Sequence, residues 1–134
     1  MNPKLYRKQI AEIGIEDMEI DISSLQNAME TMSQLNELEK VLNQIKFNIR
    51  SDIRNLRVEY MWMIHEADDL INKKSIFGKK KTIDDVMRKK KVLKKERDTN
   101  IAAYEIIENL INDYIKQIEE SRIYIKNHIQ MKVE

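Results

Sequence analysis

The sequence contains no cysteine, a single proline and two glycines among its 134 residues. A chain without cysteine forms no disulfide bond, no thiolate zinc site and no cysteine nucleophile. β-Sandwiches, β-barrels and doubly wound α/β folds need many turns, which are rich in glycine and proline. The scarcity of both residues argues against these folds and favours long helices.

Long apolar runs are also scarce. The longest covers only residues 60–64, whereas a transmembrane helix needs about 20 mostly apolar residues. No apolar stretch follows Met1, so we predict no signal peptide and expect a cytoplasmic protein.

Charge is abundant and unevenly distributed. Charged residues make up 35% of the chain, yet the net charge is only +1. Residues 1–72 have a net charge of −5, residues 73–97 of +9 and residues 98–134 of −3. A basic block between two acidic stretches is typical of a solvated surface or of contact with an anionic partner.

The basic block supplies the candidate polyanion-binding residues. They are Lys73, Lys74, Lys79, Lys80, Lys81, Arg88, Lys89, Lys90, Lys91, Lys94, Lys95 and Arg97. The expected partner is a nucleic acid or an acidic protein, with an anionic membrane surface as a weaker alternative. No helix-turn-helix, zinc or ribonucleoprotein motif accompanies the block, so binding to nucleic acid would not depend on base sequence. The other interpretation is a solvated lysine-rich turn without a partner.

Two long segments without glycine or proline carry apolar residues at helical spacing. The first, residues 24–74, has a stripe formed by Leu35, Leu38, Leu42, Ile45, Ile49, Ile53, Leu56, Tyr60, Met63, Ala67 and Leu70. The second, residues 83–131, has a stripe formed by Val86, Leu93, Tyr104, Ile107, Ile111, Tyr114, Ile115, Ile118, Ile125 and Ile129. The basic turn at 75–82 is short and forces the two helices to run antiparallel. The pattern predicts an all-α fold, a long helical hairpin that resembles a coiled coil.

The N-terminal segment, residues 1–22, predicts a short helix packed at the open end of the hairpin. Asn2 and Pro3 are typical of a helix start, and Gly14 is typical of a helix end. Residues 15–22 fit either a helix or a loop. Ser23 with Gln26 predicts a capping box for the first long helix, and Thr82 is the expected cap of the second. We expect one helical domain over residues 1–134.

The hairpin also predicts a register. A turn centred near residue 77 pairs residues whose numbers sum to about 155. Arg97 and Asn100 would then lie level with Glu59 and Asn55. Two interpretations are open: a polar layer that fixes the register, or side chains that extend outward into solvent.

Several apolar residues of the first long helix lie off its stripe. Phe47, Val58, Met61 and Trp62 point away from the expected partner helix, which predicts a second contact surface. Apolar residues also widen the stripe of the second helix beyond what one neighbour covers. We therefore expect a homo-oligomer, with these four residues as interface candidates.

Catalytic patterns are missing. The sequence has no glycine-rich phosphate loop and no spacing that pairs a nucleophile with a base. His65 with Asp68 and Asp69 has a spacing that metal sites use, but it is more typical of a solvated polar face. We predict no catalytic residues, no metal, no cofactor and no small-molecule substrate. The predicted function is a non-catalytic coiled-coil interaction or scaffold module, and the alternative is polyanion binding.

Overall fold

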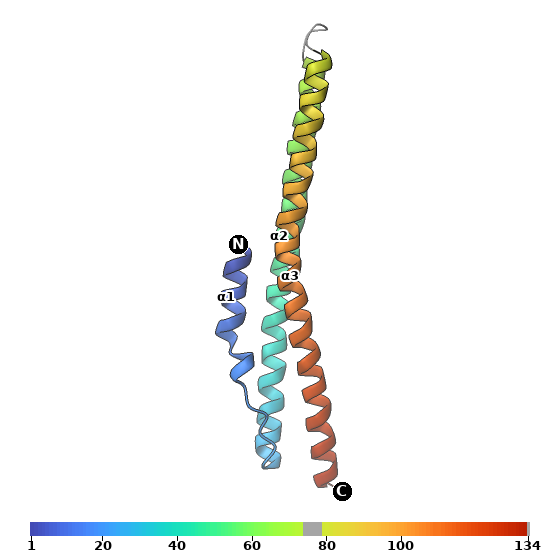
Figure 1. Ribbon diagram of the computed structural model, residues 1–134. Helices are drawn as coiled ribbons and strands as arrows, with labels where there is room; N and C mark the ends of the chain where they lie inside the picture. The colour runs from blue at the N-terminus through green and yellow to red at the C-terminus, as the bar shows by residue number, and fades with distance from the viewer. Residues whose placement is uncertain (74–78, 134) are drawn as a thin grey trace. The chain divides into compact units, whose positions relative to one another are not determined.

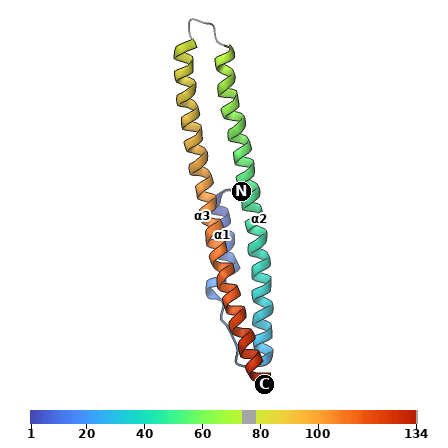
Figure 2. The same ribbon diagram turned by 90° about the vertical axis from the view of Figure 1, so that its right-hand side faces the viewer.

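The computed structural model describes residues 1–73 and 79–133. In chain order they form α1 (Pro3–Ile13), the 3-10 turn η1 (Ile15–Asp17), α2 (Leu25–Lys73) and α3 (Lys79–Val133) (Figure 1). No strand occurs within these ranges. The long helices α2 and α3 run antiparallel and side by side (Figure 2). The predicted all-α helical hairpin is confirmed.

The chain divides into two compact units. Unit 1 comprises residues 1–49 and 106–134, and unit 2 comprises residues 50–105. The boundary in α2 follows Ile49, where the apolar stripe departs from the heptad alternation by taking two successive steps of four residues, from Ile45 to Ile49 and on to Ile53. The prediction of a single domain stays a prediction, and each unit is described by itself below.

The start and end of α1 agree with the prediction. The Oδ1 atom of Asn2 accepts a hydrogen bond from the Leu5 backbone N–H at 3.0 Å, and Pro3 occupies the first turn. Gly14 ends the helix at φ 75°, where its N–H donates to the Ala11 carbonyl. A side chain at that φ would be strained, which explains why glycine terminates this helix.

The cap of α2 differs from the prediction by one residue. The Asn27 backbone N–H donates to the Ser24 hydroxyl at 3.0 Å, so Ser24 is the cap. The Ser23 hydroxyl donates instead to the Asp21 carboxylate at 2.7 Å, and Gln26 donates to Glu30 rather than back to the cap. Because the Ser23 hydroxyl binds the Asp21 carboxylate, Ser24 and not Ser23 caps the helix.

The helix α3 begins at Lys79, four residues before the predicted start at residue 83. Thr82 therefore lies inside the first turn and is not the cap, and the predicted turn at 75–82 is too long. Lysine is a good helix former, and no breaker follows Gly78. Residues 74–78 lie outside the described residues. The bounds of the other long helix, α2, lie within one residue of the predicted range 24–74 at each end.

The core of unit 1 is a row of aliphatic side chains between α2 and α3, covered by α1. The large side chains that are most deeply buried are Tyr6, Leu42, Ile49, Ile107, Ile111, Ile118 and Ile125. Each such side chain contributes about 1.5–3 kcal/mol through burial. Tyr6 and Ile10 are the buried residues of α1. The short helix packs against the unit that holds the start of α2 and the end of α3, as predicted.

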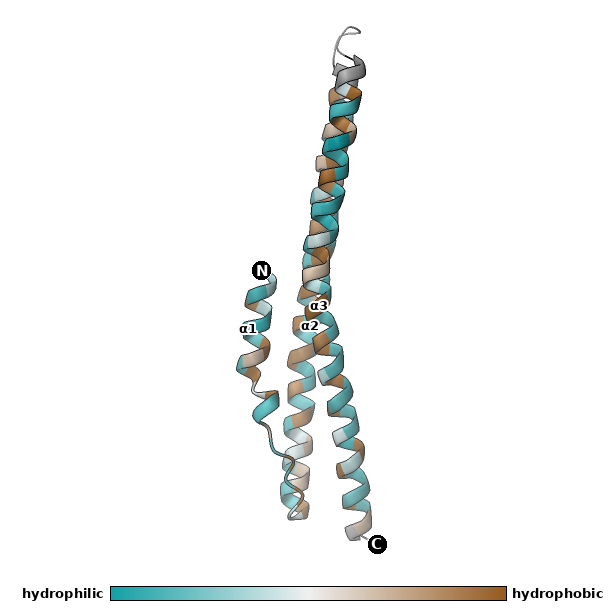
Figure 3. Ribbon diagram, in the orientation of Figure 1, coloured by the Kyte–Doolittle hydropathy of each residue, from teal (hydrophilic) through white to brown (hydrophobic). Residues whose placement is uncertain are grey.

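The core of unit 2 is thinner. It consists of Ile53, Tyr60, Ala67, Val86, Leu93 and Ile101. Met63 and Leu70 belong to the predicted stripe but are 36% and 42% exposed, because α2 meets only one neighbouring helix within this unit. Apolar residues recur at intervals along α2 and α3 and alternate with hydrophilic ones (Figure 3).

The observed contacts correct the predicted register. In unit 2, Asn100 donates to the Tyr60 hydroxyl at 2.8 Å. In unit 1, Lys46 donates to Asn112 at 2.7 Å. These pairs sum to 160 and 158, above the expected 155. Helical side chains lean toward the N-terminus of their own helix, so contacting residues of an antiparallel pair have a larger sum than residues at the same level.

The expected polar layer forms only in part. Asn100 reaches across to Tyr60 and not to Asn55. The Arg97 Nε donates to Asp98 on its own helix at 3.0 Å, and Arg97 forms no ion pair with Glu59. The Arg97 side chain is only 33% exposed, so it does not extend freely into solvent, and neither interpretation describes it. The cross-helix interpretation holds for Asn100 with a different partner.

Candidate interaction site

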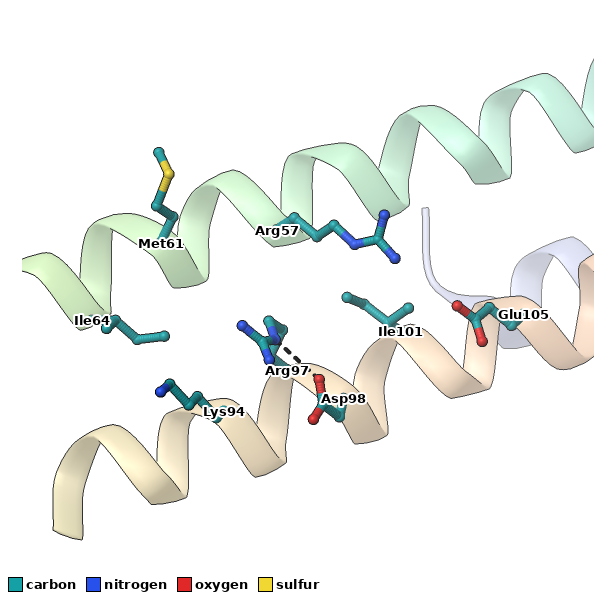
Figure 4. Close-up of a pocket in the computed structure, with 8 residues that line it drawn as sticks. All are labelled: Arg57, Met61, Ile64, Lys94, Arg97, Asp98, Ile101 and Glu105. Carbon is teal, nitrogen blue, oxygen red and sulfur yellow. Dashed lines mark hydrogen bonds and ion pairs between the residues drawn. The ribbon is translucent and has the colours of Figure 1, made fainter. Parts of the chain in front are cut away.

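A surface groove of about 620 Å³ lies between α2 and α3 in unit 2 (Figure 4). Its lining residues are Arg57, Met61, Ile64, Lys94, Arg97, Asp98, Ile101 and Glu105. Ile101 is buried and Ile64 is half-buried, so the floor of the groove is apolar. Charged side chains from both helices form its walls (Figure 4).

The groove is lined by three cations and two carboxylates, a net charge of +1. Arg97 is engaged by Asp98 (Figure 4). Arg57 extends from α2 toward α3, and neither Arg57 nor Lys94 forms an ion pair with another described residue. An apolar floor below two unpaired cations suits a ligand that carries both an apolar side chain and a carboxylate or phosphate.

Some of the predicted polyanion-binding residues are already paired with carboxylates. Arg88 pairs with Asp85 at 3.1 Å on the same helix. The Lys90 ammonium lies 2.8 Å from Asp68 of α2. Together with Arg97, these cations already have a local anionic partner, so an external polyanion gains less from them.

The rest of the predicted set divides into two groups. Exposed lysines without an ion pair in the described part of the chain are Lys89, Lys91, Lys94 and Lys95. Outside the residues whose side chains are described lie Lys73, Lys74, Lys79, Lys80 and Lys81. Of the whole set, the structure brings Lys94 and Arg97 together in the groove.

The predicted interface residues are exposed on α2. In unit 2, Val58 is 48%, Met61 58% and Trp62 59% exposed. In unit 1, Phe47 is 61% exposed. The Trp62 and His65 rings meet edge to face, with 6.3 Å between the ring centroids. Large side chains that the chain itself does not cover are available to a partner.

Two arginines beside this face were missed from the sequence. Arg54 and Arg57 lie on the same side of α2 as Met61, because their spacing of three, four and seven residues places them within about 60°. Both are exposed. A search for runs of like charge finds the lysines of α3 but overlooks cations interspersed with apolar residues. The helical spacing would have revealed them.

The histidine candidate for metal binding is not supported by the local geometry. The His65 Nε2 lies 3.9 Å from the Asp69 carboxylate, while Asp68 turns to Lys90. Over residues 1–73 and 79–133, no three histidine, aspartate or glutamate side chains gather closely enough to hold an ion.

The pKa values of two tyrosines, Tyr104 and Tyr114, are raised. The Tyr114 hydroxyl donates a hydrogen bond to Glu16 at 2.7 Å. This hydrogen bond raises the pKa of Tyr114 above its ordinary value of 10.0. Burial, followed by the charges of Asp52 and Glu59, raises the pKa of Tyr104. Both phenols therefore remain protonated hydrogen-bond donors near neutral pH.

The site as a whole is a groove with charged walls and an apolar floor beside the exposed Trp62. No helix within the described residues has an apolar stretch long enough to cross a bilayer. No protein family model, curated protein or solved structure matches the chain at a significant level.

Proposed function

We propose that the protein is a non-catalytic helical interaction module that self-associates through the exposed apolar face of α2. This apolar face is defined as Val58, Met61 and Trp62. The observation that carries the proposal is the exposure of Trp62, 59% of whose surface is accessible in the isolated chain. Tryptophan, methionine and arginine are enriched at the centres of protein interfaces.

The surroundings of the apolar face support this proposal. Arg54 and Arg57 flank it, and arginine side chains form hydrogen bonds and stack on aromatic rings within interfaces. Covering the face would remove apolar surface from water at about 25 cal/mol per Å². A contact of this kind stabilises a complex without any change in the hairpin core.

The test is the substitution Trp62→Glu. It places a charge in the proposed contact, so we expect at least tenfold weaker self-association with unchanged helicity. Sedimentation velocity over a concentration series measures association, and circular dichroism measures helicity. Met87→Glu is the matched control, because Met87 is 64% exposed on α3 of the same unit.

Two results would contradict the proposal. One is a wild-type chain that stays monomeric up to about 100 µM, which corresponds to negligible affinity. The other is equal association of Trp62→Glu and the wild type. A third variant, Ile53→Glu, checks the assignment of faces: Ile53 is 7% exposed, so this charge should lower helicity itself.

Polyanion binding is a second candidate, favoured by the four exposed lysines without ion pairs. They are Lys89, Lys91, Lys94 and Lys95. If two to four of them contact duplex phosphates, the log–log salt dependence of binding should have a slope of about −2 to −4. Replacing all four with glutamine should abolish binding to labelled DNA or RNA.

The matched control replaces four exposed lysines of unit 1 with glutamine. These are Lys4, Lys8, Lys116 and Lys126. Binding should survive in this control, because the charge lost is the same but the site is intact. Anionic vesicles are titrated in parallel, and absence of binding to every polyanion at low salt rejects this candidate.

A further inference from the structure

The two compact units carry opposite charge. Unit 1 contains 9 Lys/Arg and 13 Asp/Glu, a net charge of −4. Unit 2 contains 15 Lys/Arg and 10 Asp/Glu, a net charge of +5. The overall value of +1 conceals this difference. Two copies paired through like units would repel each other, whereas pairing of unlike units is electrostatically favourable.

Unit 2 presents a face that combines both properties. The exposed Val58, Met61 and Trp62 supply apolar surface, and the exposed Arg54 and Arg57 supply positive charge on the same side of α2. We call these five residues the basic face. Arg57 and Met61 also line the groove, so this face continues into the groove, whose other charged residues are Lys94, Arg97, Asp98 and Glu105.

Unit 1 presents a face of complementary composition on α3. Ile106 and Tyr124 are 60% and 58% exposed, and the exposed Asp113 and Glu120 lie between them in sequence. At 100° per residue the four positions fall within about 40° of one another. We call these four residues the acidic face. Within the described residues, neither carboxylate has an ion-pair partner.

The short helix leaves the acidic face uncovered. Its contacts with α3 involve Leu110 and Tyr114, which line a groove together with residues of α1 and η1. Tyr114 donates to Glu16 of η1. These residues lie about 40° or more around α3 from the acidic face. The intramolecular packing of unit 1 therefore leaves the four residues of the acidic face exposed.

We propose that the occupant of each face is the opposite face of a second copy of this chain. The basic face of one copy packs on the acidic face of another copy. This inference rests on the proposed self-association and specifies its orientation. Apolar contact supplies affinity, and the opposite charges select this pairing over pairing of like faces.

The experiment uses two charge-reversed full-length chains. The first carries Arg54→Glu and Arg57→Glu, so both of its faces are acidic. The second carries Asp113→Lys and Glu120→Lys, so both of its faces are basic. Each alone should self-associate at least tenfold more weakly than the wild type. An equimolar mixture should restore association, with the two chains in equal proportion, because each contact between unlike chains then pairs opposite charges again.

The readout is sedimentation with one chain fluorescently labelled, at low and high salt. The matched control carries Glu30→Lys and Glu37→Lys, two exposed carboxylates on α2 of unit 1. It has the same charge change outside both faces and should associate like the wild type. Circular dichroism confirms that every variant is folded.

The outcomes separate this inference from the proposed function. If the wild type does not self-associate, both fail. If it does, but the reversed chains associate equally well and the mixture shows no preference, the orientation is wrong while self-association stands. Association of either reversed chain alone at the wild-type level also overturns the inference, because pairing of like faces opposes equal charges whichever sign they carry.

Discussion

At the scale of single residues, Gly14 decides where α1 ends. Its φ of 75° is unfavourable for residues with a Cβ atom, although no heavy atom within 4 Å would contact one. We expect Gly14→Ala to cost about 1–2 kcal/mol of stability through backbone strain alone. Gly14→Asn should cost less, since asparagine tolerates this conformation better. Urea unfolding of both variants provides the measurement, and equal loss would point to a different cause.

Tyr114 makes a pH-dependent contribution to unit 1. Its hydroxyl donates to Glu16, and that hydrogen bond raises its pKa in the folded chain. A raised folded pKa means that the stabilisation is complete below the unfolded value of 10.0 and is lost as pH rises through the folded value. The residue is near the surface, so the effect should be below about 1 kcal/mol.

The test compares the wild type with Tyr114→Phe in urea at pH 7 and pH 11. The wild type should be slightly more stable at pH 7, and the difference should shrink at pH 11. The other tyrosines titrate equally in both chains and cancel. A difference that stays constant between the two pH values would show that the hydroxyl contributes nothing through its proton.

At the scale of a helix, α2 separates buried from exposed side chains within two residues. Ile49 is fully buried, whereas Phe47 is 61% exposed. Ile49→Ala should therefore cost about 2–5 kcal/mol, because it removes a packed side chain and leaves a cavity. Phe47→Ala should change stability by less than about 0.5 kcal/mol. Thermal or urea unfolding at a concentration where the chain is monomeric checks this; similar losses would contradict the burial pattern.

The helices themselves could be predicted, because their signals are local. Asn2, Pro3 and Gly14 define α1 by backbone chemistry that needs no tertiary contact. The cap of α2 was misplaced by one residue, since two adjacent serines compete and Asp21 selects between them. The burial of Thr31 was not predicted. A buried hydroxyl needs a hydrogen-bond acceptor, and the Thr31 hydroxyl donates to the carbonyls of Asp21 and Asn27, ten and four residues away.

At the scale of the whole chain, pairing of the long helices could be predicted but not its detail. Two apolar stripes and a short connection are sufficient for a hairpin. The residue pairs that contact each other could not be predicted by counting residues alone. Each side chain points toward the N-terminus of its own helix, and the count ignores this direction. The groove was missed because Arg57 and Lys94 come from different helices. Only the register brings them together, so the candidate site was less predictable than the fold.

The separation of contacts along the chain has a consequence for the order of folding. The Asn100–Tyr60 contact of unit 2 spans 40 residues, whereas Arg122–Asn36 and Tyr114–Glu16 of unit 1 span 86 and 98. Closing the longest of these loops from an unfolded chain costs about 0.8 kcal/mol more than closing the shortest. Once unit 2 has formed, the remaining loops are effectively shorter, so the helices should pair progressively from unit 2 toward unit 1. Pulsed hydrogen exchange during refolding should then show protection of residues 50–70 before residues 30–49, and simultaneous protection would rule out this sequence of events.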